Sequence, residues 1–241
     1  MMRTSLIILG LLTLVAGNAA AQTGFFSFDT SLMKAQQTGE GQDLVYTGPG
    51  GTDRLANYNA IMVDQPEVHF AADSKYRGMK PEDSAALAGI LRDNMTTELK
   101  KGGYAVVDQP GPQVLFLRMA LVDLYIKKDK RGLLSYTPVG IVVHAGADAL
   151  TDTLKKIDII EMSVAAEVVD SRSGDVIGAV LLKRGHKKEH GQKETRMEVD
   201  ELVALAQEYS QRFHCRLDNA KKPEAQRINC DDAAARKAAG M

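Results

Sequence analysis

The sequence of 241 residues contains no tryptophan, and aromatic residues make up only 5% of it. Proteins that bind single-stranded nucleic acid stack bases on aromatic side chains, and few are present for that purpose here. The chain also lacks an excess of either charge, because 30 basic and 31 acidic residues leave a net charge of −1. Nucleic-acid-binding domains usually carry a strongly basic face. We therefore expect no nucleic-acid partner.

No apolar run approaches the ~20 residues that a transmembrane helix requires. The short run Leu6–Val15 follows Arg3 and precedes the small residues Ala19, Ala20 and Ala21. A basic residue, a short apolar run and an Ala-x-Ala site form the pattern of a secretory signal peptide. The sequence predicts that residues 1–21 are a signal peptide and that the chain has no transmembrane segment.

A lipid anchor is not expected either. Leu14, Val15, Ala16 and Gly17 match the start of a bacterial lipobox, but Asn18 stands where the lipid-accepting cysteine is needed. Without a thiol, no lipid can be attached. We expect an exported, periplasmic protein without a lipid anchor.

Cysteine is also scarce, because Cys215 and Cys230 are the only two in the chain. A lone pair in an exported protein predicts a structural disulfide, which would stabilise the fold by ~3 kcal/mol. A redox or metal-binding role would favour CxxC spacing and nearby ligands, and only His214 is adjacent. We therefore predict a Cys215–Cys230 bridge.

The stretch "HKKEH" matches the H-x-x-E-H pattern of zinc proteases through His186, Glu189 and His190. A zinc site needs both histidines on one rigid helix face and a third ligand. Gly185 and Gly191 flank the motif, and no apolar side chain lies between them to dock a helix. We interpret the stretch as a solvated loop, keep these three residues as weak metal candidates, and expect no cofactor.

The sequence predicts three parts after the signal peptide. Residues 22–57 are rich in Gly, Gln, Thr and Asp without apolar periodicity, which predicts an extended lead-in segment that drapes on the domain or is mobile. Residues 58–217 form a single sandwich domain. Residues 218–241 form a polar tail tied by the disulfide.

The fold class predicted for this domain is α+β, with a mixed, mainly antiparallel sheet packed against two long helices. Apolar residues recur at helical spacing in residues 81–101 and 199–217. Residues 114–126 are apolar on both strand faces, with Leu124 and Val122 on the same one, so this strand should be central. Residues 159–169 alternate, which predicts one buried face and one wet face bearing Glu161, Ser163, Ala165 and Glu167. The turn "DSRSGD" predicts an antiparallel hairpin with the next strand.

An apolar insertion, residues 132–158, separates two of the strands. We expect it to cover the second face of the central strand, because no other apolar segment is left in the chain to do so. The alternative is a surface that binds a partner or a second copy of the chain. The candidates for partner contact are Leu133, Leu134, Val139, Ile141, Val142 and Val143.

Three phrases resemble a family of bacterial lipoproteins named domain of unknown function 3313: "GFFSFDTSL", "AIMVDQPEV" and "AAEVVDSRSGDVIGAV". The resemblance covers most of residues 24–217. It implies no catalytic residues, and the missing lipobox cysteine departs from the pattern. The implied architecture is similar to periplasmic sandwich domains of TolB-like and curli-secretion-like envelope proteins, which work through protein contacts.

Three functions are therefore considered. The first is a non-enzymatic exported envelope protein that acts through an envelope protein partner or self-association. The second is a periplasmic small-ligand-binding protein, which would need a polar-lined pocket. The third, and least favoured, is a metallohydrolase built on the H-x-x-E-H stretch.

The zinc alternative leads to a first prediction. Replacing both His186 and His190 with alanine should leave the melting temperature nearly unchanged, because an exposed loop contributes little to stability. Elemental analysis and thermal unfolding of the native protein and the variant test this. Stoichiometric zinc that survives dialysis and is lost in the variant would contradict it.

Overall fold

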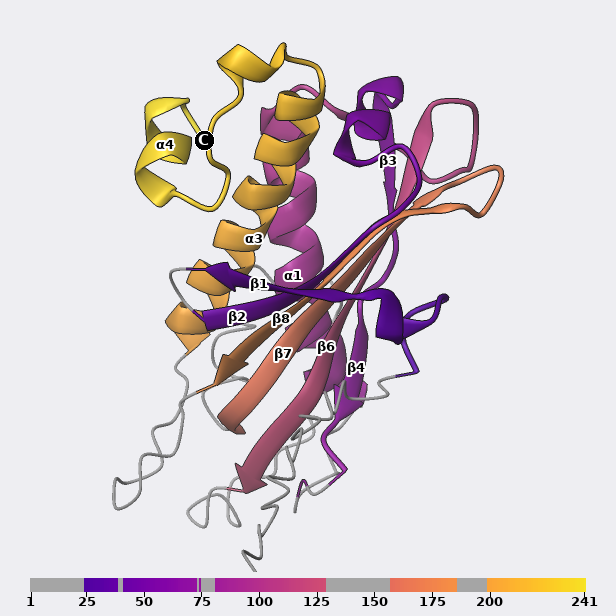
Figure 1. The fold of residues 1–241 in the computed structure, drawn as a ribbon. Coiled ribbons are helices and arrows are strands. Elements are labelled where there is room, and N and C mark those ends of the chain that lie inside the picture. Colours follow the sequence, from indigo (N-terminus) through magenta and orange to yellow (C-terminus); the bar gives the residue numbers. More distant parts are fainter. Residues whose placement is uncertain (1–23, 39–40, 73, 75–80, 129–156, 186–198) are drawn as a thin grey trace, which may run out of the picture.

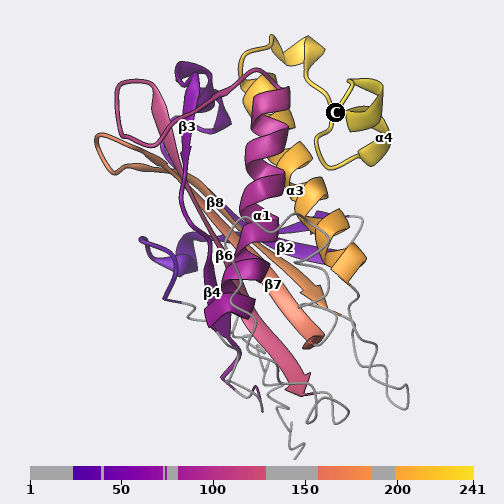
Figure 2. The same cartoon turned by 180° about the vertical axis from the view of Figure 1, so that it is seen from behind.

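The structure, a computed structural model, describes residues 24–38, 41–72, 74, 81–128, 157–185 and 199–241. Its strands form one sheet, and two long helices lie side by side on one face of it (Figure 1). Figure 2 looks onto these helices with the sheet behind them. We call the face toward the helices the helix face and the opposite one the outer face.

Eight strands make up the sheet within the described residues, and seven of them follow the order β1-β2-β8-β7-β6-β3-β5. Their bounds are β1 Lys34–Thr38, β2 Gly41–Thr47, β3 Ala60–Val63, β4 Glu67–Phe70, β5 Ala105–Val106, β6 Val114–Lys128, β7 Ile157–Asp170 and β8 Val176–Gly185. The pairs from β1 to β6 are antiparallel, whereas β3 pairs in parallel with β5 and β6, and β4 in parallel with β6. The predicted α+β class with a mixed, mainly antiparallel sheet is confirmed.

The helices are α1 (Pro81–Lys101), α3 (Val199–Ala220) and the short α4 (Ala233–Ala238), with 3₁₀ turns η1 (Thr30–Leu32), η2 (Thr52–Asn57) and η3 (Glu224–Gln226). Proline and two acids begin α1, and two lysines end it, as a helix dipole favours. The positive φ that ends this helix belongs to Gly103, at 79°. Gly102, just before it, makes room for a neighbour, since a Cβ there would collide with the His214 imidazole.

Strand β6 is central, and its helix face is deeply buried from Leu115 to Leu121. A bulge interrupts its pairing with β7 near Asp123, which has φ of 53°. The bulge shifts the alternation by one residue. Leu124 therefore packs with Leu121 in the helix-side core, and its expected place beside Val122 was wrong.

The outer face of β6 is covered by the amino-terminal segment. Phe25 is 2% exposed and forms a second apolar cluster with Ala120 and Val122 of β6, Ala165 of β7 and Leu181 of β8. Phe26, Met33 and Leu44 pack against this cluster. The expectation that only residues 132–158 could provide apolar side chains to cover this face was therefore wrong. Residues 129–156 themselves lie outside the described residues.

The outer face of β7 is not wet, as the sequence pattern had suggested. Glu161 is exposed, but Ser163, Ala165 and Glu167 are buried, and Glu167 is 0% exposed. Its carboxylate accepts hydrogen bonds from the Ser27 backbone N–H at 2.9 Å and from the Ser27 hydroxyl at 2.7 Å. Arg118, its register partner on β6, donates a third at 2.7 Å from Nη1. A charge can be buried here because it is paired and fully hydrogen-bonded.

The lead-in segment also contributes to the sheet itself. Strand β1 pairs with β2, which in turn pairs with β8. The sequence showed no apolar period there because β1 is an edge strand whose described side chains, Lys34–Gln37, are exposed. These two strands were not foreseen.

The hairpin between β7 and β8 forms as predicted, and Asp170 organises its turn. Its Oδ1 accepts hydrogen bonds from the backbone N–H groups of Arg172 and Ser173, and Gly174 takes φ of 77°. The Tyr58 hydroxyl donates to Asp170 Oδ2 at 2.7 Å. The bond from the Ser173 N–H, followed by that from Tyr58, lowers the pKa of Asp170 from 3.8 to about 2. Burial, followed by this same bond, raises the pKa of Tyr58 to about 12.

The depressed pKa of Asp170 makes the hairpin sensitive to acid. A carboxylate with a lowered pKa in the folded state stabilises the fold above its unfolded pKa, and this contribution is lost as pH falls from about 4 to about 2. We expect Asp170→Asn to cost roughly 1 kcal/mol at pH 7, after allowance for solvent screening, and progressively less below pH 4.

Urea unfolding of both proteins between pH 7 and pH 2 measures this difference. Tyr58→Phe removes one hydrogen bond to the same carboxylate and should reproduce part of the effect. A stability difference that stays constant across this pH range would contradict the assignment.

Candidate functional site

An apolar cavity of about 270 Å³ lies between the helix face of the sheet and the helices α1 and α3. We call it the core cavity. It is larger than the ~150 Å³ apolar cavity that can hold benzene. Aliphatic and aromatic side chains from sheet and helices make most of its wall: Val45, Leu55, Leu91, Met95, Leu117, Met119, Val164, Ala166, Val168, Ile177, Ala179, Val180, Leu182, Tyr209 and Phe213.

One part of the core cavity is polar. Gln36, Arg212, Arg216 and Asp231 line it beside the apolar residues. Arg212 is 3% exposed, whereas Gln36 lies on the exposed edge strand β1. The lining therefore runs from a buried guanidinium to the protein surface.

Arg212 belongs to a set of charges that we call the arginine cluster: Arg212, Arg216, Arg236, Glu208 and Asp231. Arg212 Nε lies 3.2 Å from Asp231 Oδ1 and 3.6 Å from Glu208 Oε1. Arg216 Nη2 donates to the same Asp231 oxygen at 2.9 Å, and Arg236 Nη2 to Glu208 Oε1 at 3.4 Å. Two carboxylates thus pair with three guanidinium groups, and each carboxylate contacts two arginines through the same oxygen atom.

Arg216 has further electrostatic neighbours. Burial lowers its pKa below the ordinary 12.5, with Arg212 and Arg236 acting in the same direction and Asp231 and the buried Asp43 opposing it. The group stays protonated at neutral pH, because an arginine starts from so high a pKa. Arg216 is therefore a permanent cation.

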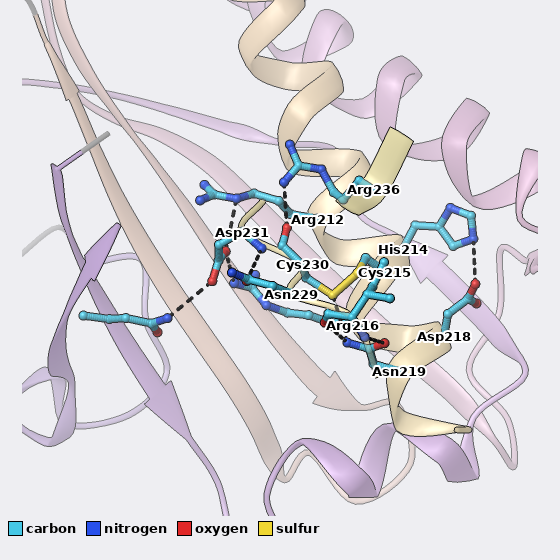
Figure 3. The surroundings of a disulfide bond; sticks show 12 residues. Arg212, His214, Cys215, Arg216, Asp218, Asn219, Asn229, Cys230, Asp231 and Arg236 are labelled. Carbon is cyan, nitrogen blue, oxygen red and sulfur yellow. Dashed lines mark hydrogen bonds and ion pairs between the residues drawn. A yellow bond between two sulfur atoms is a disulfide. The ribbon is translucent and has the colours of Figure 1, made fainter. Parts of the chain in front are cut away.

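The predicted disulfide brings the tail to this cluster. Cys215 of α3 is bonded to Cys230, next to Asp231, and the prediction is confirmed (Figure 3). The Cys230 carbonyl accepts a hydrogen bond from Arg236 Nη1 at 2.6 Å. The Asn219 side chain donates to the Ile228 carbonyl and accepts from its N–H, which holds the chain between the two cysteines against α3. The tail is thus fixed along α3 by covalent and polar bonds.

Arg212 is incompletely satisfied. Among the described residues, neither its Nε nor its Nη1 has a hydrogen-bond partner, although Nε lies at ion-pair distance from Asp231 and Glu208 and the side chain is almost wholly buried. Buried donors of this kind are rare, because losing water without a replacement partner costs ~1–3 kcal/mol or more for a charged group. Arg212 is one of the residues that line the core cavity.

A second polar group joins α1 to α3. His214 Nδ1 lies 2.8 Å from Glu98 Oε1, and its Nε2 lies 3.5 Å from Asp218 Oδ2. The Tyr104 hydroxyl donates to Asp218 at 2.8 Å, and burial, followed by this bond, raises the pKa of Tyr104. Gly102 packs directly beneath the imidazole. Each polar group has a partner here, so the arrangement holds the helices together.

The structure describes only some of the site residues that were predicted from the sequence. His186, Glu189 and His190 lie outside the described residues, as do the six partner-contact candidates from Leu133 to Val143. Within the described part of the chain, no three metal-ligating side chains come together. No helix in that part is long and apolar enough to cross a membrane.

The arginine cluster was missed in the sequence. Glu208, Arg212 and Arg216 recur every four residues along α3, which places them on one helix face. Such a stripe of charged residues is typical of a solvent-exposed helix surface. Nothing in the sequence shows that the tail folds back over it.

The chain matches a family model described as "Protein of unknown function (DUF3313)" over residues 21–213. The chain belongs to this family. The match confirms the resemblance seen in the three sequence phrases. A search of curated proteins gave no match.

Solved structures of a different protein match part of this chain. A point variant of the PelC dodecamer from Paraburkholderia phytofirmans is 15% identical, with a TM-score of 0.32, over 69% of this chain and 90% of that chain. A second PelC dodecamer from the same organism is 12% identical, with a TM-score of 0.31, over 69% of this chain and 91% of that chain.

The disulfide makes a prediction about stability. Replacing Cys215 and Cys230 with serine should lower the free energy of unfolding by ~3 kcal/mol, because the bridge no longer restricts the unfolded chain. Denaturant unfolding measures the loss, and mass spectrometry of unreduced peptides should show the bridge in the native protein. Two free thiols in the native protein, or an unchanged unfolding midpoint, would be inconsistent with this role.

Proposed function

We propose that this chain is an exported, non-enzymatic envelope protein that acts in the periplasm through an envelope partner or self-association. The signal-peptide pattern in residues 1–21 supports export, and the missing lipobox cysteine supports a form without a lipid anchor. Family membership is compatible with this role.

The observation that carries the proposal is the double cover of β6. The helices cover one face of this strand, and Phe25 with its apolar neighbours packs on the other. A lid from residues 132–158 is therefore not needed over these positions. The second interpretation of that apolar segment, a surface for protein contact, becomes the stronger one.

The reactive side chains of the described residues also favour binding over catalysis. Both cysteines are consumed in the disulfide. His69 is paired with Glu67 at 2.8 Å, and His214 is paired between Glu98 and Asp218. His214 is also buried, so it is not placed to meet a substrate.

The contact surface can be tested with Ile141→Asp combined with Val143→Asp. If the segment binds protein, the free energy of unfolding should stay within about 0.5 kcal/mol of wild type, as for surface changes. Self-association or capture of an envelope partner should be lost. Size exclusion with light scattering, pull-down from envelope extract and denaturant unfolding on one preparation give all three readouts.

The matched control is Thr151→Asp combined with Thr153→Asp, which adds the same charges to polar positions of the segment. It should leave association unchanged. A loss of several kcal/mol in stability for the Ile141 and Val143 variant alone would show a lid rather than a contact surface.

Ligand binding is a second candidate, favoured by one specific observation. The core cavity is apolar over most of its wall and carries an incompletely bonded arginine at its polar end. Ligand pockets commonly combine an apolar wall with a few placed polar groups. The third candidate, a metallohydrolase, gains no support from the described residues.

A further inference from the structure

We infer that the core cavity binds one acyl chain with a carboxylate head, and that Arg212 receives the head. This inference rests on the second candidate function, ligand binding. It is independent of the proposed protein contacts of residues 132–158.

The wall of the cavity selects the tail of the ligand. Helix residues such as Leu91 and Phe213 face sheet residues such as Met119 and Val164 across the space. This mainly apolar wall offers few hydrogen bonds to a sugar or a peptide, whereas burying an alkyl chain contributes ~0.8 kcal/mol for each CH₂ group. At about 270 Å³, the space is just below typical ligand pockets of ~300–1,000 Å³. A single chain of medium length suits it better than a two-chain lipid.

Arg212 selects the head of the ligand. A guanidinium has only donors, so its unpartnered Nη1 requires an oxygen acceptor. Arg212 and Arg216 line the cavity together with Asp231, and Glu208 and Asp43 lie close by, so these arginines already have acidic neighbours. A carboxylate supplies the missing acceptor together with a negative charge, which strengthens the hydrogen bond, and its planar geometry matches the guanidinium fork. An alcohol supplies only the acceptor.

The surrounding charges keep Arg212 in place. Asp231 and Glu208 contact its Nε and leave Nη1 free, so the acids hold the side chain without using that donor. Arg236 lies behind them, bonded to Glu208 and to the Cys230 carbonyl. Buried Asp43 of β2 adds a negative charge near Arg216. The head group would therefore meet a donor that is already oriented.

Titration calorimetry of the mature chain, residues 22–241, with sodium decanoate and with decanol tests the inference. Both ligands are kept below the concentration at which they aggregate. We expect one decanoate per chain, bound about tenfold more tightly than decanol, because the hydrogen bond is to a charged group. Octanoate should bind more weakly than decanoate. Equal affinity for decanoate and decanol would overturn the role of Arg212, and more than one site would show detergent-like binding only.

Two variants separate the tail from the head. Ala166→Leu adds bulk to the cavity wall without touching the arginine cluster, and it should abolish decanoate binding while the melting temperature is kept. Val203→Leu, at an exposed position on α3, is the matched control and should bind as the wild type does. If both leucine variants bind decanoate equally well, the ligand is not in the cavity and the inference fails.

Arg212→Lys keeps the charge but loses the planar fork, and it should reduce the preference for decanoate over decanol. If Arg212→Lys does not fold, the Ala166→Leu variant alone decides whether decanoate binds in the cavity. Ala166→Leu should also leave self-association and partner capture unchanged. If the wild type does not bind decanoate, only this inference fails. If the Ile141→Asp, Val143→Asp variant associates as the wild type does, only the contact proposal fails.

Discussion

The need to keep water from both faces of strand β6 governs the arrangement of the whole chain. Leu115 to Leu121 are almost fully buried on the helix face, and Ala120 and Val122 are 0% exposed on the outer face. A two-layer domain normally covers only one face of an antiparallel sheet. Here α1 and α3 cover the helix face, and the segment around Phe25 covers the outer one. The amino-terminal segment is therefore part of the core.

The polar interactions fix this cover in one position. Glu167 is wholly buried and bonded to Arg118, its cross-strand partner, and to Ser27 of the covering segment. The Arg118 guanidinium also lies 4.9 Å from the centre of the Phe25 ring. Burial of an ion pair adds little net stability by itself, but a displaced segment would leave a buried carboxylate short of two donors. The apolar cover supplies the driving force, and the ion pair specifies its register.

The parts of this fold that depend on local periodicity could be read from the sequence. The two long helices, the central strand, the hairpin and the disulfide follow from apolar spacing, turn residues and cysteine count. The outer-face cover could not be read in this way, because Phe25 and Phe26 lie in a polar, aperiodic segment. Glu167 looked like a solvated residue because its partner Arg118 is 49 positions away. The bulge at Asp123 places Leu124 on the other face. This could not be predicted, because a positive φ at aspartate has no clear sequence signal.

The arginine cluster and the core cavity are two results of the same incomplete packing. Helices α1 and α3 span the sheet, but small residues such as Ala166 and Gly178 leave space beneath α3 that larger side chains would fill. The disulfide holds Asp231 over the end of this space, where it pairs with arginines that would otherwise face solvent. A cavity lowers stability by an amount that grows with its volume, and an unsatisfied buried donor lowers it further. The covalent bridge offsets part of that cost by tying the tail to α3, so the chain can keep an apolar cavity next to a buried guanidinium.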